Sequence, residues 1–221
     1  LGSSDTEVIL AGFEILGVKE TILLLNGMFA IGLWDKINCE LTLIRDRGGE
    51  KPIYYGWQNN VFVFGSTLSS IRTHPSFKAK IDNSSLNLFM KYSYVPSSKS
   101  IYKDIFKLEP GTILRVNTRD KQCIVERYWS FHTEYKNNEL YNIGSESNLI
   151  DNLDDILTNA VLNQTISDVP IGSFLSGGID SSIISCLLQK VTIGKARTFT
   201  IGFNEKGFDE SKYAKKISEL I

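Results

Sequence analysis

The feature that most limits the fold is one short segment in the second half of the chain, Phe174-Leu175-Ser176-Gly177-Gly178-Ile179-Asp180-Ser181-Ser182. An apolar run at residues 171–175 predicts a short buried strand, and apolar residues at helical spacing over residues 183–188 predict a helix after the glycines. A strand that enters a helix through a glycine-rich turn directs free backbone N–H groups and the positive helix end toward one point. The segment therefore predicts an α/β unit with an anion site, suited above all to phosphate.

The polar residues of this turn indicate which phosphate chemistry to expect. We expect Asp180 to hold a Mg²⁺ ion carried by the phosphate. A Walker A loop has a lysine directly after its glycines, whereas the next lysine here is Lys190. A loop of hydroxyls and N–H groups suits a released pyrophosphate better than the transfer of a γ-phosphoryl group. The alternative is a small-residue turn that serves only close packing between strand and helix.

Length and composition allow either one large domain or two small ones in this chain of 221 residues. The net charge of -1 gives no reason to expect a nucleic acid or an anionic membrane as partner. No apolar run approaches the roughly 20 residues of a transmembrane helix. The cysteines are odd in number and form no C-x-x-C pair, which predicts reduced, buried thiols in a cytoplasmic protein.

The first half predicts an antiparallel sheet with helices. Ser4 and Glu7 have the spacing of a capping box at the start of a helix. Tight turns join four expected strands into one sheet, over residues 27–34, 39–44, 53–57 and 61–64. The first of them is apolar on both faces, so we expect it to be covered on both. A helix over residues 84–92, a loop at 96–100 and a hairpin of residues 112–116 and 123–128 complete this half.

The second half has the pattern of an α/β domain. Residues 131–147 are polar and predict a linker between domains of residues 1–130 and 148–221. A helix over residues 149–161 precedes the glycine-rich turn, and residues 197–203 predict a second strand. Because a helix connects the two strands, we expect parallel pairing. Asp209 is expected to cap a final helix.

Several segments resemble the glutamine-hydrolysing asparagine synthetase family. Ser4-Asp5-Thr6-Glu7-Val8 is similar to the family's Ser-Asp-x-Glu-Val motif. Residues 45–55, Arg-Asp-Arg-Gly-Gly-Glu-Lys-Pro-Ile-Tyr-Tyr, resemble its charged hairpin, although by themselves they predict a solvated turn that shapes the domain. Residues 168–182 resemble its synthetase loop most closely. The similarity extends from Ser4 to about Leu220.

The resemblance implies both a fold and an activity. The fold would be the C-terminal part of an N-terminal-nucleophile glutaminase domain, an α+β sandwich of antiparallel sheets, followed by the start of an α/β parallel-sheet ATP-pyrophosphatase domain. The activity would be that of a ligase in asparagine biosynthesis. Ammonia from glutamine would be transferred to an aspartate activated with AMP, and ATP would yield AMP and pyrophosphate. The implied partners are glutamine, aspartate, ATP and Mg²⁺, and a homodimer is left open.

The resemblance also assigns roles to residues. Asp5 would bind the α-amino group of glutamine, with a helix-capping acid as the alternative. Leu175 and Ile201 would contact the adenosine of ATP, although Ile201 also fits a core strand. The phosphates would be held by Ser176, Gly177, Gly178, Ser181 and Ser182. Asp180 would bind Mg²⁺.

The chain also departs from the family. It begins Leu1-Gly2-Ser3 instead of with the family's nucleophilic cysteine, so no catalytic residue is assigned. The family's second loop, Ser-Gly-Glu-Gly-x-Asp-Glu, is absent from residues 183–221. We therefore expect an internal fragment that is inactive by itself. Two other functions stay open: a related amidotransferase acting on a sugar acid or another cell-surface precursor, and a non-catalytic relative that binds ATP.

Overall fold

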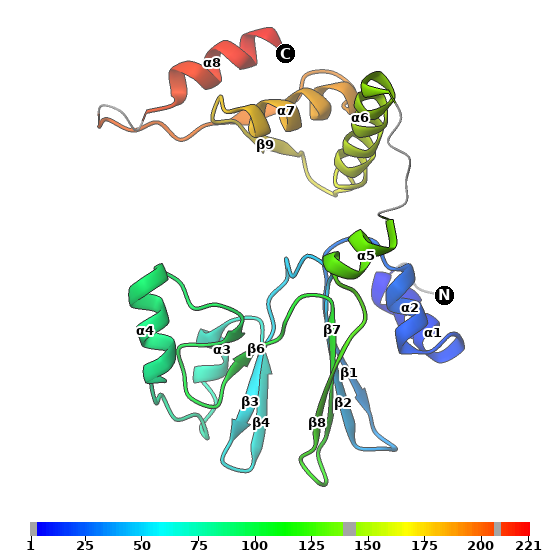
Figure 1. Ribbon diagram of the computed structural model, residues 1–221, viewed down its shortest axis with the longest axis vertical. Coiled ribbons are helices and arrows are strands. Elements are labelled where there is room, and N and C mark those ends of the chain that lie inside the picture. The colour runs from blue at the N-terminus through cyan, green and yellow to red at the C-terminus, as the bar shows by residue number, and fades with distance from the viewer. Residues whose placement is uncertain (1–3, 139–144, 206–208) are drawn as a thin grey trace. The chain divides into compact units, whose positions relative to one another are not determined.

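The computed structural model describes residues 4–138, 145–205 and 209–221. The chain divides into two compact units, Leu1–Leu140 and Tyr141–Ile221, and each is described by itself (Figure 1). The limits of the predicted domains and linker stay a prediction. Within the predicted linker, however, the structure contains a helix, α5 (Phe131–Asn138), that the sequence analysis did not predict.

The N-terminal unit combines helices with antiparallel strands. Besides α5, its helices are α1 (Asp5–Ile15), α2 (Val18–Leu24), α3 (Leu68–Arg72) and α4 (Asn83–Tyr92). Its strands are β1 (Ala30–Asp35), β2 (Glu40–Arg45), β3 (Tyr54–Gln58), β4 (Val61–Gly65), β5 (Ser98–Lys99), β6 (Phe106–Lys107), β7 (Thr112–Asn117) and β8 (Cys123–Arg127). The helices α1 and α4 confirm their predictions, whereas α2, α3 and the short strands β5 and β6 are not predicted, and β5 lies within the predicted loop.

The strands form two sheets, with orders β1-β2-β7-β8 and β4-β3-β6-β5. All their pairings are antiparallel. The predicted single sheet of the first four strands is therefore wrong, because its two hairpins belong to different sheets. Leu43 and Leu114 are paired on the first sheet and share one core cluster with Tyr55, Trp57 and Phe62 of the second. Because side chains from both sheets build this core, the predicted antiparallel sandwich is confirmed.

The first strand differs from its prediction in extent and in burial. It begins at Ala30, and its exposed and half-buried residues alternate along the strand. Trp34 is 46% exposed. The expectation that both faces are covered is therefore wrong. The physical reason is that β1 is an edge strand with a neighbour on one side only, so its residues are only partly covered.

Helix α1 starts after Ser4 as predicted, although the described residues show no hydrogen bond between Ser4 and Glu7. The hydroxyl of Ser4 accepts a hydrogen bond from the Thr6 N–H at 3.2 Å, as an N-cap residue does. The neighbouring Asp5 carboxylate accepts a second bond from the same N–H at 2.7 Å. Two acceptors thus share one N–H of the first turn.

The charged segment that starts at the end of β2 is buried at its first two residues, so the prediction of a solvated turn is wrong for them, whereas Glu50 and Lys51 are exposed as predicted. Arg45 and Asp46 are 4% and 1% exposed. The Arg45 guanidinium donates to three backbone carbonyls, those of Leu108, Gly49 and Lys51. Burial lowers the pKa of Arg45, and the charge of Asp46 opposes that shift. A buried charge is tolerated here because its donors are satisfied.

Asp46 organises the same segment from its other side. Its two carboxylate oxygens accept from the N–H groups of Glu50 and Lys51, each at 2.9 Å. Its backbone carbonyl accepts from Gly49 and Gly111 at 3.1 Å and 2.9 Å. The two chain segments that cross between the sheets, after β2 and after β6, are therefore joined at this residue.

The C-terminal unit contains α6 (Glu146–Asn163), β9 (Gly172–Phe174), α7 (Ile179–Val191), β10 (Arg197–Phe199) and α8 (Ser211–Leu220). Strands β9 and β10 pair in parallel, which confirms that prediction. The strand before the glycines is not buried as expected, because Phe174 is 79% exposed while Leu175 is 2% exposed. Helix α8 begins beside Asp209 as predicted, although Glu210 is its N-cap residue.

The sequence predicts reduced, buried thiols and no transmembrane helix. All three thiols are free, but Cys123 and Cys186 are exposed and Cys39 is half-buried, so the prediction of buried thiols is wrong. Among the described residues, none of the helices has the length and apolar character needed to cross a membrane.

Replacement of Asp46 by alanine tests the importance of this buried carboxylate. The change leaves the N–H groups of Glu50 and Lys51 without acceptors, and we expect it to lower the free energy of unfolding by about 2–4 kcal/mol. The matched control is Asp120→Ala, at an exposed turn where the carboxylate accepts from Gln122. Denaturant unfolding of the two variants measures the difference, and equal losses would contradict the role of Asp46.

Candidate functional site

The glycine-rich loop joins β9 to α7 and is anchored at its first residue. The N–H of Leu175 donates to the Phe199 carbonyl at 2.8 Å and continues the pairing with β10. The Leu175 carbonyl accepts from the Thr200 hydroxyl at 2.6 Å. Because Leu175 is also buried, the start of the loop is fixed on the sheet.

Gly177 occupies a position that only glycine fits. Its φ of +85° lies in the left-handed region that L side chains rarely adopt. A Cβ atom there would lie 2.6 Å from the Cβ of Tyr213 and 2.9 Å from its carbonyl carbon. Helix α8 therefore packs directly on the loop backbone. Gly178 has ordinary dihedral angles, and a Cβ there would meet only the Ser176 hydroxyl, at 3.4 Å.

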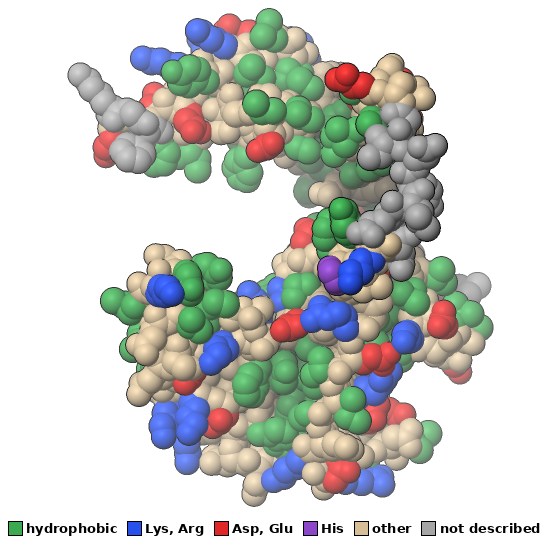
Figure 2. Space-filling model, in the orientation of Figure 1, with side chains coloured by type: hydrophobic (Ala, Val, Ile, Leu, Met, Phe, Trp, Pro, Cys, Tyr) green, Lys and Arg blue, Asp and Glu red, His purple; other side chains and the backbone are tan. Residues whose placement is uncertain are grey.

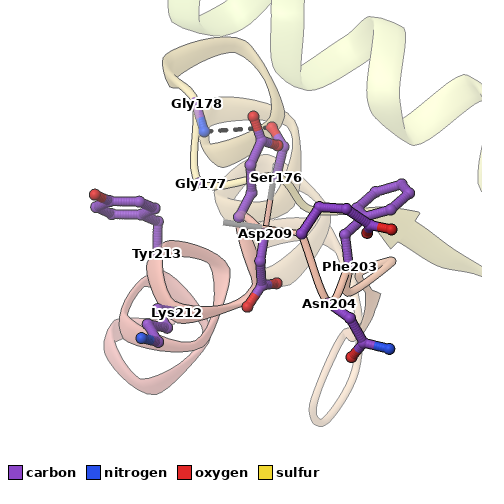
Figure 3. Close-up of a pocket in the computed structure, with 10 residues that line it drawn as sticks. Ser176, Gly177, Gly178, Phe203, Asn204, Asp209, Lys212 and Tyr213 are labelled. Atoms are coloured by element: carbon purple, nitrogen blue, oxygen red, sulfur yellow. Dashed lines mark hydrogen bonds between the residues drawn. The ribbon is translucent and has the colours of Figure 1, made fainter. Parts of the chain in front are cut away.

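The serine hydroxyls of the loop bond to one another and to the loop backbone. The Ser176 and Ser181 hydroxyls lie 2.9 Å apart. Ser181 and Ser182 donate to the Gly178 carbonyl at 3.2 Å and 2.7 Å. The Gly178 N–H donates to the Ser176 hydroxyl at 3.3 Å (Figure 3). In this conformation the hydroxyls hold the loop in shape.

The start of α7 offers free backbone donors. The N-cap residue is Gly178, and no side chain caps this end within the described part of the chain. The N–H groups of Ile179, Asp180 and Ser181 have no acceptor among the described residues, and the N–H of Ser182 is the first to bond within the turn, to Gly178. Uncapped N–H groups at a helix start attract an anion.

A pocket of about 680 Å³ opens beside this loop (Figure 3). Ser176, Gly177 and Gly178 form one wall. The others come from residues 203–205 and from the start of α8, where Asp209, Glu210, Lys212 and Tyr213 line the pocket. The sequence analysis did not find these α8 residues, apart from Asp209 as a helix cap. The glycine at position 177 is a sequence clue to these residues. Its requirement is understood only from the packing of α8 against it.

The charged residues of the pocket lining are mainly acidic. Glu205, Asp209 and Glu210 face one base, Lys212. Hydrogen bonds from the Ser211 side chain and N–H, and from the Phe203 N–H, lower the pKa of Asp209, with a smaller contribution from the charge of Lys212. Asp209 therefore stays ionised at neutral pH. Among the described residues, no three His, Cys, Asp or Glu side chains converge to hold a metal ion.

A smaller hollow of about 300 Å³ lies next to the acidic pocket. Leu175 and Ile201 both line it, together with Phe174 and Phe199. Ile201 is 68% exposed, so it is not a core residue as its alternative interpretation has it. Ser176 lines both hollows. Phe203 and Glu210 also line both, so an apolar hollow adjoins a polar one along three shared residues.

The two predicted carboxylates lie in different units. Asp180 is exposed in the first turn of α7, outside the lining of both hollows. One carboxylate suits a Mg²⁺ ion that is also bound by phosphate, since Mg²⁺ commonly takes one or two carboxylates and substrate phosphates. Asp5 is exposed in the first turn of α1, where it accepts from Thr6. The structure leaves both interpretations of Asp5 open.

Sequence comparison matches a different protein family to each of the two units. The family of glutamine amidotransferase domains matches residues 1–129. The chain belongs to this family. Its C-terminal part, residues 152–221, matches the asparagine synthase family, so the glycine-rich loop lies in a synthase-type segment.

Two curated relatives show how far the similarity extends. A putative glutamine-hydrolysing asparagine synthetase 2 of Methanocaldococcus jannaschii is 36% identical over 99% of this chain and 41% of its own length. The glutamine-hydrolysing asparagine synthetase 1 of Bacillus subtilis is 33% identical over 99% of this chain and 33% of its own. The chain therefore spans between one third and about two fifths of the length of these relatives. The solved structure of the allosteric regulatory enzyme of purine biosynthesis aligns with 94% of this chain and 41% of its own, at 17% identity and a TM-score of 0.40.

Alanine at Gly177 tests the contact between α8 and the loop. We expect Gly177→Ala to destabilise the C-terminal unit by roughly 1–2 kcal/mol from the left-handed backbone and by about 1–3 kcal/mol more from the contact with Tyr213. Gly194 is a matched control, because its φ is +94° but nothing lies within 4 Å of an added Cβ.

Denaturant unfolding and hydrogen exchange of the α8 amides distinguish the two variants. Gly194→Ala should leave exchange in α8 unchanged, whereas Gly177→Ala should accelerate it. The same loss of stability in both variants, with α8 equally protected, would contradict the contact.

Proposed function

We propose that this chain is part of a glutamine-dependent asparagine synthetase. Ammonia from glutamine would be transferred to an aspartate that is activated with AMP from ATP. Support comes from the order of the two matching families along the chain and from relatives with that name at 33–36% identity. The enzyme would be a ligase that is active in the cytoplasm, a location that free thiols favour.

The observation that carries the synthetase half is the pair of adjoining hollows. The apolar hollow suits a nucleoside base and ribose, and the polar pocket adjoins the uncapped start of α7. A nucleotide placed with its base beside Ile201 would bring its phosphates past Ser176 to the loop. Fixed N–H groups at a helix start, without a Walker lysine, favour release of pyrophosphate over transfer of the γ-phosphoryl group.

Each predicted site residue receives a role in this proposal. Leu175 and Ile201 contact the adenosine. The phosphates are held by the remaining loop residues, Ser176, Gly177, Gly178, Ser181 and Ser182. The serine hydroxyls must then turn away from the Gly178 carbonyl in order to donate to a ligand. Asp180 binds the Mg²⁺ that accompanies ATP, and Asp5 binds the α-amino group of glutamine.

The acids of the polar pocket support a requirement for Mg²⁺. Three carboxylates and one ammonium group line it, so a bare triphosphate meets repulsion. Bound to the phosphates, Mg²⁺ neutralises part of their charge. The chain's own contribution is to place N–H donors on the phosphate oxygens and the Asp180 carboxylate near the metal.

The labelled products of ATP test the proposed function. The protein at its full natural length is incubated with α-labelled ATP, glutamine, Mg²⁺ and aspartate, and the nucleotides are separated. We expect labelled AMP, with asparagine formed in equal amount. Labelled ADP as the main product would contradict the pyrophosphatase assignment. AMP formed only with another acceptor would contradict asparagine as the product.

Two single substitutions should separate the half-reactions. Asp180→Ala removes the metal ligand, and we expect ATP-dependent synthesis below about a tenth of the unaltered rate with glutaminase activity retained. Asp5→Asn removes a charge-assisted bond to an ammonium group, and we expect the KM for glutamine to rise about 10- to 150-fold. Synthesis from free ammonia should be unaffected by Asp5→Asn.

Both variants are assayed with glutamine and with ammonia as nitrogen source. Asp151→Ala, at an exposed site on α6, serves as the control for loss of one surface carboxylate. Retained synthesis in Asp180→Ala would contradict the metal role. An unchanged KM for glutamine in Asp5→Asn would return Asp5 to the role of a helix-capping acid.

A further inference from the structure

A pocket of the N-terminal unit has no part in the function proposed above. It has a volume of about 700 Å³ and lies beside α4. Its walls come from β3, α3, α4, the segment after α4, β5 and β6. Small-molecule sites commonly measure about 300–1,000 Å³ and are concave in this way. The pocket therefore has the size and shape of a small-molecule site.

Apolar and aromatic side chains form most of the pocket wall. Leu86 and Phe89 on α4 line it and stay 40% and 44% exposed. Tyr94, which follows the helix, also lines it and is 61% exposed. Figure 2 shows hydrophobic side chains gathered over α4, with basic side chains next to them. Grouped exposed apolar residues of this kind indicate a binding surface.

Two ammonium groups and no carboxylate line this pocket. Lys107 is half-buried on β6, where it pairs with Tyr54, and its Nζ lies 5.7 Å from the centroid of the Tyr54 ring. Burial, together with the positive charge of Arg45, lowers the pKa of Lys107. Within the part of the chain that the structure describes, no ion pair involves Lys107. Lys99, the other base, donates to the Ser84 hydroxyl at 2.7 Å.

A half-buried ammonium group in an apolar wall has lost part of its hydration without gaining a counter-ion. An anion placed beside it would restore that interaction. A hydrophilic anion would leave the apolar wall unused, and a neutral apolar molecule would leave Lys107 unpaired. A molecule with an apolar body and an anionic group would contact the apolar wall and pair with Lys107 at the same time.

We propose that this pocket binds a small molecule with a flat apolar body and one carboxylate. The carboxylate lies at Lys107, and the body lies between Tyr54 and the Leu86–Phe89 face of α4. A concave wall built from several elements favours a small molecule over a peptide helix, which would need a long groove. The proposal does not depend on the synthetase reaction.

A pair of probe molecules tests the proposal on the unaltered protein at its full natural length. The probes are 3-phenylpropanoate and 3-phenylpropan-1-ol, which share the apolar body and differ in charge. Titration followed by NMR measures both affinities. We expect the carboxylate to bind about tenfold or more tightly than the alcohol, with shifts confined to the elements that line the pocket.

Three variants locate the site. Lys107→Gln should remove the preference for the carboxylate, and Phe89→Ala should weaken both probes. The matched control is Lys103→Gln, on an exposed lysine of the segment before β6 that does not line this pocket. It should change neither affinity. If Lys107→Gln fails to fold, Lys107→Met replaces it. The comparison of the two probes on the unaltered protein then still tests whether the pocket prefers the carboxylate.

Several results would overturn the proposal. These are equal affinities of the two probes, an unchanged preference in Lys107→Gln, or no saturable binding of 3-phenylpropanoate. Saturable binding of an acidic amphipathic peptide where 3-phenylpropanoate fails would identify a protein docking surface instead, and would equally show the proposal to be wrong.

Discussion

The N-terminal unit depends on two neighbouring buried charges, Arg45 and Asp46. Both segments that cross from one sheet to the other pass beside them. Arg45 binds carbonyls on each segment, at Gly49 and Leu108, while Asp46 binds N–H groups at Glu50 and Gly111. The Tyr128 hydroxyl, directly after β8, donates to the Arg45 carbonyl at 2.9 Å. The end of the β7–β8 hairpin is therefore bonded to Arg45 as well. Without these bonds, the buried polar groups where the two segments meet would have no partner.

Features that depend on neighbours in sequence could be predicted. Ser4 caps α1 because its hydroxyl needs only the N–H two residues later. The hairpins follow from alternating apolar residues and short turns, and the parallel pairing of β9 with β10 follows from the helix between them. The loop from Leu175 to Ser182 was recognised for the same reason: a strand, two glycines and a helix occupy one continuous stretch.

Features that depend on distant partners could not be predicted. The strands at 30–45 and 54–65 look like one meander, but tight turns do not specify whether a hairpin continues the same sheet or crosses to another. The charged run from Arg45 looks solvated, because composition does not reveal that backbone carbonyls will surround the guanidinium. Likewise, nothing near Gly177 in the sequence indicates Tyr213, although the packing of that residue is what requires a glycine.

The pocket beside the loop combines two opposed electrostatic features. The free N–H groups at the start of α7 attract an anion, whereas Glu205, Asp209 and Glu210 repel one. A phosphate chain that carries Mg²⁺ satisfies both, since its oxygens face the N–H groups and its metal offsets the carboxylates. Bare pyrophosphate lacks that compensation. In the proposed function, the loop thus provides the preference for phosphate. The carboxylates at the start of α8, about thirty residues later, would add a preference for phosphate that is bound to a metal.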